Sequence, residues 1–122
     1  FKKPLTIYGD GKQVRDILFI SDLVKLFELE TEKIKRLSGE AFNIGGGKSN
    51  TISLLELIEI LEKISRSKLS YKFSDWRPAD QKVYYSDISK VKKHLNWEPK
   101  VSAKQGVEKT YQWIEENREL FA

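Results

Sequence analysis

The sequence contains no cysteine, no methionine and a single histidine, His94. The absence of cysteine excludes disulfides, thiolate metal sites and a cysteine nucleophile. One histidine cannot by itself build a metal site or a Ser-His-Asp triad, and His94 lies in a basic stretch where a helix-end residue is expected. We therefore predict no metal site and, from the missing thiols, a reducing, cytoplasmic location.

Long apolar runs and an excess of one charge are also missing. No run approaches the roughly 18 to 20 residues of a membrane span. The 22 basic and 18 acidic residues give a net charge of +4 and are mostly interleaved, which indicates a mildly basic surface rather than a nucleic-acid-binding stripe. The sequence therefore predicts neither a membrane nor a nucleic acid as partner.

The 122 residues, 39% hydrophobic and 33% charged, suit one compact domain spanning 1–122. The chain opens on Phe1 rather than Met and has no signal-like leader, so we expect a piece cut from a longer protein. Period-two and helical patterns alternate along it, which predicts an α/β fold. The predicted strands are 5–8, 14–20, 41–44 and 69–73, with a brief extended piece at 83–85. The predicted helices are 23–37, 54–66, 88–95 and one that follows Ser102.

Several helix starts carry capping signals. Ser53 with Glu56 and Ser102 with Gln105 have the spacing of capping boxes. Ser21 or Asp22 is expected to cap the first helix, and Asp87 the short helix 88–95. The serines are therefore better explained as caps than as nucleophiles.

Two arginines with an aspartate carry the strongest functional signal. Arg15 lies in Val-Arg-Asp, and Arg77 and Asp80 lie in Arg-Pro-Ala-Asp much further along the chain. A guanidinium is a permanent, planar fork that suits phosphate, and a carboxylate can accept hydrogen bonds from sugar hydroxyls. The alternative is ordinary ion pairing, Arg77 with Asp80 or Arg15 with Asp22.

Three further features have two interpretations each. The run 45–47 (Gly-Gly-Gly) is either a phosphate cradle or a tight loop with positive φ, and it matches neither G-x-G-x-x-G nor G-x-x-x-x-G-K-[ST]. Asn43, just before it, is a turn former or a ligand contact. Tyr8 either stacks on a base or packs in the core. No convincing acid/base pair is present, so no catalytic residue is predicted.

Four motifs in this order resemble the C-terminal half of extended short-chain dehydrogenase/reductases, the NAD-dependent nucleotide-sugar epimerases and dehydratases. The motifs are 5–16 (LTIYGDGKQVRD), 42–47 (FNIGGG), 77–81 (RPADQ) and 86–99 (SDISKVKKHLNWEP). They cover essentially the whole chain, and within the family they are most similar to the CDP-tyvelose/CDP-paratose 2-epimerase branch. UDP-glucose 4-epimerase and dTDP-glucose 4,6-dehydratase are more distant.

The resemblance implies a substrate-binding role for this part of the enzyme. It implies that Arg15 and Arg77 hold the diphosphate of a nucleotide-diphosphate sugar and that Asp80 contacts the ribose. It places Tyr8 and Ile52 beside the base and Asn43 at the pocket edge, six residues in all. One departure is Ala79, where many relatives have glycine.

The resemblance also implies what this chain does not supply. In the family, NAD is bound by an N-terminal Rossmann domain with a glycine fingerprint and a Tyr-x-x-x-Lys pair. The glycine fingerprint does not occur in this sequence, and the only Tyr-x-x-x-Lys spacing, from Tyr8 to Lys12, spans the Gly-Asp-Gly turn signal that follows the first predicted strand. We therefore expect NAD to bind only in the full-length enzyme and the isolated fragment to be catalytically inert. We also expect two further partners: the chain's own Rossmann domain and a second copy of the protein in a homo-oligomer. The alternatives are a free-standing, non-catalytic nucleotide- or phosphate-binding module and a scaffold segment.

Overall fold

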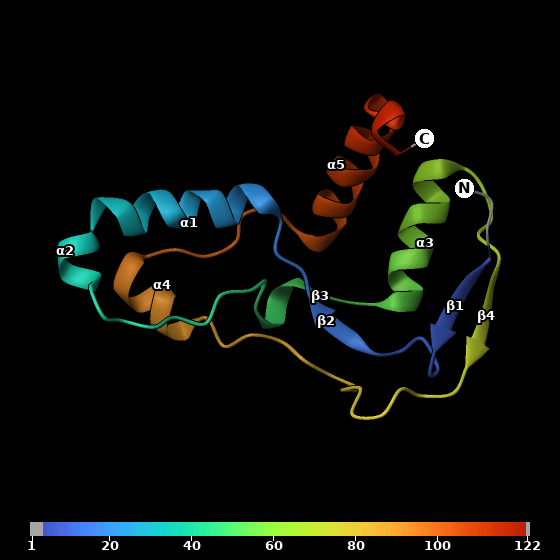
Figure 1. Cartoon of the computed structure of the whole chain (residues 1–122), viewed down its shortest axis with the longest axis horizontal. Coiled ribbons are helices and arrows are strands. Elements are labelled where there is room, and N and C mark those ends of the chain that lie inside the picture. Colours follow the sequence, from blue (N-terminus) through green and yellow to red (C-terminus); the bar gives the residue numbers. More distant parts are fainter. Residues whose placement is uncertain (1–3, 122) are drawn as a thin grey trace.

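The computed structural model, which describes residues 4–121, contains two sheets of two strands each, one of which lies at the edge of the molecule (Figure 1). β1 (Leu5–Tyr8) pairs in parallel with β4 (Tyr71–Ser74), and Leu5 faces Tyr71 in the register. β2 (Val14–Asp16) pairs antiparallel with β3 (Thr51–Ser53). Strands alternate with helices, so the predicted α/β class is confirmed.

The helices follow the predicted apolar periodicity, except that the single helix predicted over 23–37 is split at Lys33. They are α1 (Ile20–Glu32), α2 (Ile34–Leu37), α3 (Leu54–Ser65), α4 (Ser89–Leu95) and α5 (Ala103–Glu116), with short 3₁₀ turns η1 (Lys48–Asn50) and η2 (Arg118–Phe121). Both predicted capping boxes form, at Ser53 with Glu56 and at Ser102 with Gln105. The predicted cap of α4 at Asp87 is wrong: the N-cap is Ile88, and the Asp87 carboxylate only accepts a hydrogen bond from the amide of Ser89, two residues later, at 2.9 Å.

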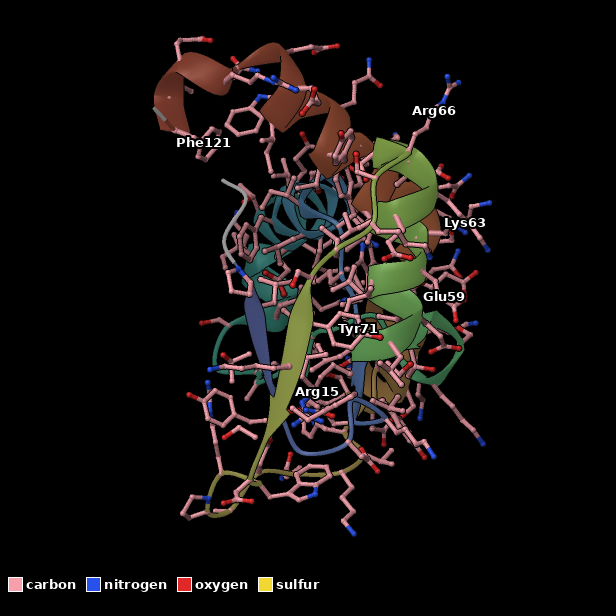
Figure 2. The ribbon with its side chains drawn as sticks, turned by 90° about the vertical axis from the view of Figure 1, so that its right-hand side faces the viewer. Arg15, Glu59, Lys63, Arg66, Tyr71 and Phe121 are labelled. Carbon is pink, nitrogen blue, oxygen red and sulfur yellow. The ribbon has the colours of Figure 1, made fainter. Side chains whose placement is uncertain are left out.

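The main apolar cluster joins α1, α2 and α4 at one end of the molecule (Figure 1). Leu26 and Val91 are fully buried in it, and Trp97 packs beside them. The Trp97 indole N–H donates to the carbonyl of Asp22 at 3.1 Å, which satisfies its one polar atom. At the other end α3 packs against α5, and Figure 2 shows Glu59, Lys63 and Arg66 along the outer side of α3.

Three further local predictions are wrong. Residues 41–44 form no strand, because no neighbouring strand lies within residues 4–121 to receive their backbone hydrogen bonds. β2 ends at Asp16 rather than at Ile20, because β3 offers only three partners and the amide of Ile17 turns to the carbonyl of Asn50. Neither Ser21 nor Asp22 caps α1, whose N-cap is Phe19.

The Asp22 side chain is used elsewhere. Its carboxylate is buried and accepts hydrogen bonds from the amides of Lys100 and Val101, at 3.0 and 2.9 Å. The same aspartate that the sequence offers as a local cap therefore ties α1 to the segment that leads into α5. None of the helices described is both long and apolar enough to pass through a bilayer.

Candidate functional site

The loops that follow β1 and β4 lie side by side, because the two strands are parallel and end at the same edge (Figure 1). Tyr8 is the last residue of β1, and the Gly9 amide donates to the carbonyl of Ser74, the last residue of β4, at 2.9 Å. Gly9 has φ of +84°, and a Cβ there would lie 2.6 Å from the Trp76 ring. Glycine is therefore needed for both the turn and the close approach of the second loop.

Residues 77–80 form a tight turn of type II character. Pro78 and Ala79 occupy its two central positions, Ala79 has φ of +61°, and the Asp80 amide donates to the Arg77 carbonyl at 3.2 Å. Proline suits the first central position, and the second requires positive φ, where glycine is the least strained residue. The Arg-Pro-x-Asp spacing thus places an arginine and an aspartate at the two ends of one turn.

Arg15 reaches this turn from β2. Its guanidinium makes an ion pair with the Asp80 carboxylate at 2.9 Å and also donates to the Val14 carbonyl at 2.8 Å. The two side chains are 37% and 23% exposed, so the pair is partly shielded but still reachable from solvent. This ion pair is neither of the two considered from the sequence. Asp80 does not pair with its neighbour Arg77, and Arg15 does not pair with Asp22.

Arg77 lies over the ring of Tyr8, with its guanidinium carbon 4.0 Å from the ring centre. This distance is well inside the roughly 6 Å limit of a cation–π contact. Four of the six predicted residues are thus brought together from three segments: Tyr8, Arg15, Arg77 and Asp80. Figure 2 shows Arg15 near the carboxyl ends of β1 and β4.

The other two predicted residues stand apart. Ile52 faces Arg15 in the β2–β3 register but is only 7% exposed, so its side chain belongs mainly to the core. Asn43 is exposed on the coil before the glycine run, and the ion pair and ring contact of the other four residues do not involve it.

Asp16 joins three segments and was not predicted as a functional residue. Its carboxylate accepts hydrogen bonds from the amides of Gly47 and Ser86 at 3.0 and 3.1 Å. Partial burial would raise the pKa of this carboxyl, but the hydrogen bonds from Ser86 and Gly47 outweigh burial and hold the pKa below its usual value. The signal available in the sequence was only that Asp16 follows Arg15.

The glycine run is built for close packing. A Cβ at Gly45 would lie 2.2 Å from the Ser86 hydroxyl, and one at Gly46 would lie 2.1 Å from the Ile17 carbonyl oxygen. Only Gly47 has positive φ, +71°, and its amide already donates to Asp16. The tight-loop interpretation is thus supported, and the residues of this chain do not fit a dinucleotide such as NAD at this run.

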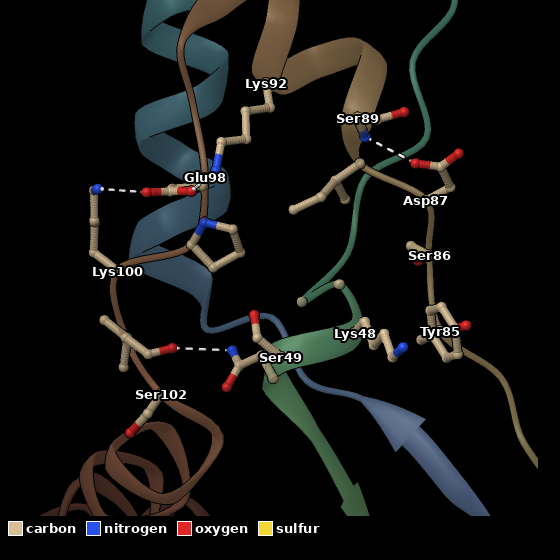
Figure 3. A pocket seen from close by; sticks show the side chains of 16 residues that line it. Lys48, Ser49, Tyr85, Ser86, Asp87, Ser89, Lys92, Glu98, Lys100 and Ser102 are labelled. Atoms are coloured by element: carbon tan, nitrogen blue, oxygen red, sulfur yellow. Dashed lines mark hydrogen bonds and ion pairs between the residues drawn. The ribbon is translucent and has the colours of Figure 1, made fainter.

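A groove with a volume of about 960 Å³ lies elsewhere, between η1, α4 and the segment that precedes α5 (Figure 3). None of the six predicted residues lines it. Lys92 and Lys100 both bind the Glu98 carboxylate, and these hydrogen bonds hold the pKa of Glu98 below its usual value. Within residues 4–121 no cluster of three or more His, Cys, Asp or Glu side chains could hold a metal ion.

The architecture is that of an α/β domain in which Tyr8, Arg15, Arg77 and Asp80 gather at the carboxyl ends of the parallel strands β1 and β4. We call these four residues the loop cluster. The chain belongs to the GDP-mannose 4,6 dehydratase family, whose family model matches residues 1–110. It is 43% identical over 111 residues to a CDP-paratose 2-epimerase of Salmonella typhi, covering 91% of this chain and 33% of the relative. It is also 43% identical over 119 residues to a UDP-glucuronate 4-epimerase of Thermodesulfobacterium geofontis, covering 98% of this chain and 36% of the relative.

The solved structures agree. The UDP-glucuronic acid 4-epimerase of Bacillus cereus, in complex with UDP-glucuronic acid and NAD, superimposes with a TM-score of 0.83 at 38% identity, covering 94% of this chain and 36% of that one. A dTDP-glucose 4,6-dehydratase of Bacillus anthracis in complex with NAD gives a TM-score of 0.79 at 31% identity, covering 96% of this chain and 36% of that one. The chain therefore spans about a third of the length of its relatives, and the resemblance to extended short-chain dehydrogenase/reductases is confirmed.

Proposed function

We propose that this chain is the substrate-binding part of an NAD-dependent nucleotide-sugar epimerase or dehydratase and that it anchors the nucleotide diphosphate. The observation that carries the proposal is the convergence of Arg15, Arg77 and Asp80 at the carboxyl ends of β1 and β4. Crevices at such strand ends are common ligand sites in α/β folds. The Bacillus cereus relative, which holds UDP-glucuronic acid, supports a ligand of this class.

Each residue has a proposed role that follows from its chemistry. Arg15 and Arg77 bind the diphosphate, since a guanidinium offers paired donors and a permanent charge. Asp80 accepts hydrogen bonds from the ribose hydroxyls and is already positioned by Arg15. Tyr8 is proposed to contact the base, and Ile52 to support the base from the core; Asn43, which stands apart from the other residues, is proposed only as a contact at the edge of the bound ligand.

NAD and the reacting groups are proposed to come from the rest of the enzyme. The Bacillus cereus and Bacillus anthracis enzymes contain NAD, whereas in the glycine run of this chain the Gly47 amide already donates to Asp16 and the space beside Gly45 and Gly46 is filled by the protein itself. We accordingly propose that the chain packs against its own Rossmann domain in a cytoplasmic homo-oligomer, and that it contributes no catalytic group.

The test is calorimetric titration of UDP, CDP, GDP and dTDP into the full-length protein and its variants. Arg15→Ala and Arg77→Ala should each weaken binding of the preferred nucleotide by about 2 to 3 kcal/mol, the range for hydrogen bonds to charged groups. Arg→Lys at either position should restore only part of the loss, because a point charge does not reproduce a planar fork.

The matched control is Lys93→Ala, which removes an exposed positive charge on α4, outside the loop cluster. It should leave binding nearly unchanged, so a general loss of positive charge can be separated from loss of these two arginines. Parent-like binding by both alanine variants would show that the guanidiniums are structural ion-pairing groups only. Binding without any sugar-modifying activity in the full-length protein would favour the non-catalytic binding module.

A further inference from the structure

Arg77 is held by an aromatic ring and not by hydrogen bonds of its N–H groups. Its guanidinium stacks over Tyr8 at 4.0 Å, and no described residue accepts a hydrogen bond from it or pairs with its charge. Arg15, in contrast, already donates to Val14 and to Asp80. A guanidinium carries five N–H donors in its own plane. The contact with the ring uses none of these donors in a hydrogen bond to a described residue, so they remain available to a ligand.

The Tyr8 ring is a firmly placed platform for this contact. Tyr8 ends β1, where it pairs with Ser74 of β4. Its carbonyl accepts a hydrogen bond from the amide group of Gln13 at 2.7 Å, and Gln13 is itself buried. The backbone that carries the ring is therefore fixed by a strand on one side and by a buried side chain on the other.

The arginine has little else to hold it. Arg77 lies on an exposed turn. The Arg15–Asp80 ion pair attaches the turn to β2, and backbone hydrogen bonds join Val14 to Lys82 and Tyr84, which follow the turn. A long, freely rotating arginine would lose side-chain entropy on binding a ligand, about 2 kcal/mol at most. A side chain already stacked in one orientation has less entropy to lose.

We propose that Tyr8 is a positioning residue that acts through Arg77: its ring orients the Arg77 guanidinium toward the phosphates of the ligand. This inference rests on the proposed function, because it assumes that Arg77 binds the diphosphate. It assigns to Tyr8 a contribution to phosphate binding, distinct from the contact with the base. One ring face is taken by Arg77, so this contribution of the ring to phosphate affinity passes through the arginine.

Inorganic pyrophosphate separates the two roles, because it has no base. Its affinity is measured by competition against a fluorescent nucleoside diphosphate bound to the full-length protein, beside the affinities for UDP and CDP. Tyr8→Leu should weaken pyrophosphate and the nucleotides by a similar factor, about 2- to 30-fold, the range that a cation–π contact supports. Tyr8→Phe keeps the ring face and should remain within about 2-fold of the parent.

A double-mutant comparison makes the test specific to the pair. In the Arg77→Ala background, Tyr8→Leu should have no further effect on pyrophosphate affinity. Tyr71→Leu, a matched change of a strand tyrosine outside the cluster, should leave all affinities unchanged. Thermal unfolding of each variant checks that a loss of affinity does not come from a loss of fold.

Two results would overturn the inference. If Tyr8→Leu weakens UDP or CDP but leaves pyrophosphate unchanged, the ring acts on the base. If its effect persists undiminished without Arg77, the ring does not act through the arginine. These results differ from failure of the proposed function, in which Arg77→Ala itself would bind pyrophosphate and nucleotides like the parent.

Discussion

Arg15 and Arg77 have the same chemistry but different surroundings, and residue type alone could not have told them apart. The sequence indicated both as phosphate ligands through their charge and geometry. Their partners depend on which segments meet in space: Arg15 pairs with Asp80, 65 positions later. Arg77 stacks on Tyr8, a contact that leaves no local trace in the sequence. Residue types were therefore predictable, and pairings required the fold.

Ala79 is the residue at which the turn is strained. An alanine at φ of +61° costs roughly 1 to 2 kcal/mol relative to a right-handed conformation. Ala79→Gly removes this strain but gains unfolded-chain entropy, so we expect its stability to change by less than about 1 kcal/mol and its nucleotide affinity to be retained. Ala79→Val should lower both, because a β-branched residue is a severe outlier at positive φ.

The measurement is urea unfolding together with nucleotide titration of the full-length protein. Ala41→Val, on an exposed coil with no such requirement, is the matched control and should change stability by less than about 0.5 kcal/mol. A valine at position 79 that is tolerated as well as the one at position 41 would contradict the strained turn.

Element by element, locally encoded features were predictable and partner-dependent ones were not. The capping boxes at Ser53 and Ser102 formed as expected because every group involved lies within three residues. The strand expected at 41–44 did not form, since strands depend on neighbours rather than on their own composition. β3 was missed because only three residues separate η1 from α3.

The start of α3 gives a prediction at this scale. The Ser53 side chain caps the helix by accepting a hydrogen bond from the amide of Glu56. The amide of Leu55 donates to the Gly11 carbonyl at 3.1 Å, which joins the start of α3 to the turn after β1. Ser53→Ala should lower the free energy of unfolding by about 1 kcal/mol, the usual cost of a lost cap. Urea unfolding measures this, with Ser38→Ala as a control, because Ser38 follows α2 without capping a helix start. Equal stability of the two variants would contradict the role of the cap.

The whole molecule leaves an apolar stripe uncovered on α1 and α2. Ile20, Val24, Phe27 and Ile34 recur at helical spacing, and each is about half exposed or more. Monomeric proteins rarely expose large contiguous apolar patches without a partner. The chain spans about a third of its relatives' length, so we expect the remaining part of the enzyme to cover this stripe.

Consequently the 122-residue chain alone should self-associate. Sedimentation velocity across a concentration series should show dimers or larger species. Phe27→Lys should shift the distribution toward monomer, because it places a charge in the centre of the stripe. Gln112→Lys adds the same charge on an exposed position of α5 and should leave the distribution unchanged. A strictly monomeric parent would show that the stripe does not mediate contact between copies.

The separation of Arg15 from Asp80 also has a consequence during synthesis. Asp80 is added 65 positions after Arg15, and at about 5 to 20 residues per second the ribosome needs roughly 3 to 13 s to bridge that interval. During this time α1 and α3 can form from local contacts, whereas the parallel β1–β4 pairing must wait for its second strand. The loop cluster is thus assembled late in translation. A nascent chain that ends before Arg77 carries Tyr8 and Arg15 but lacks Arg77 and Asp80, and so offers a ligand only one of the two arginines.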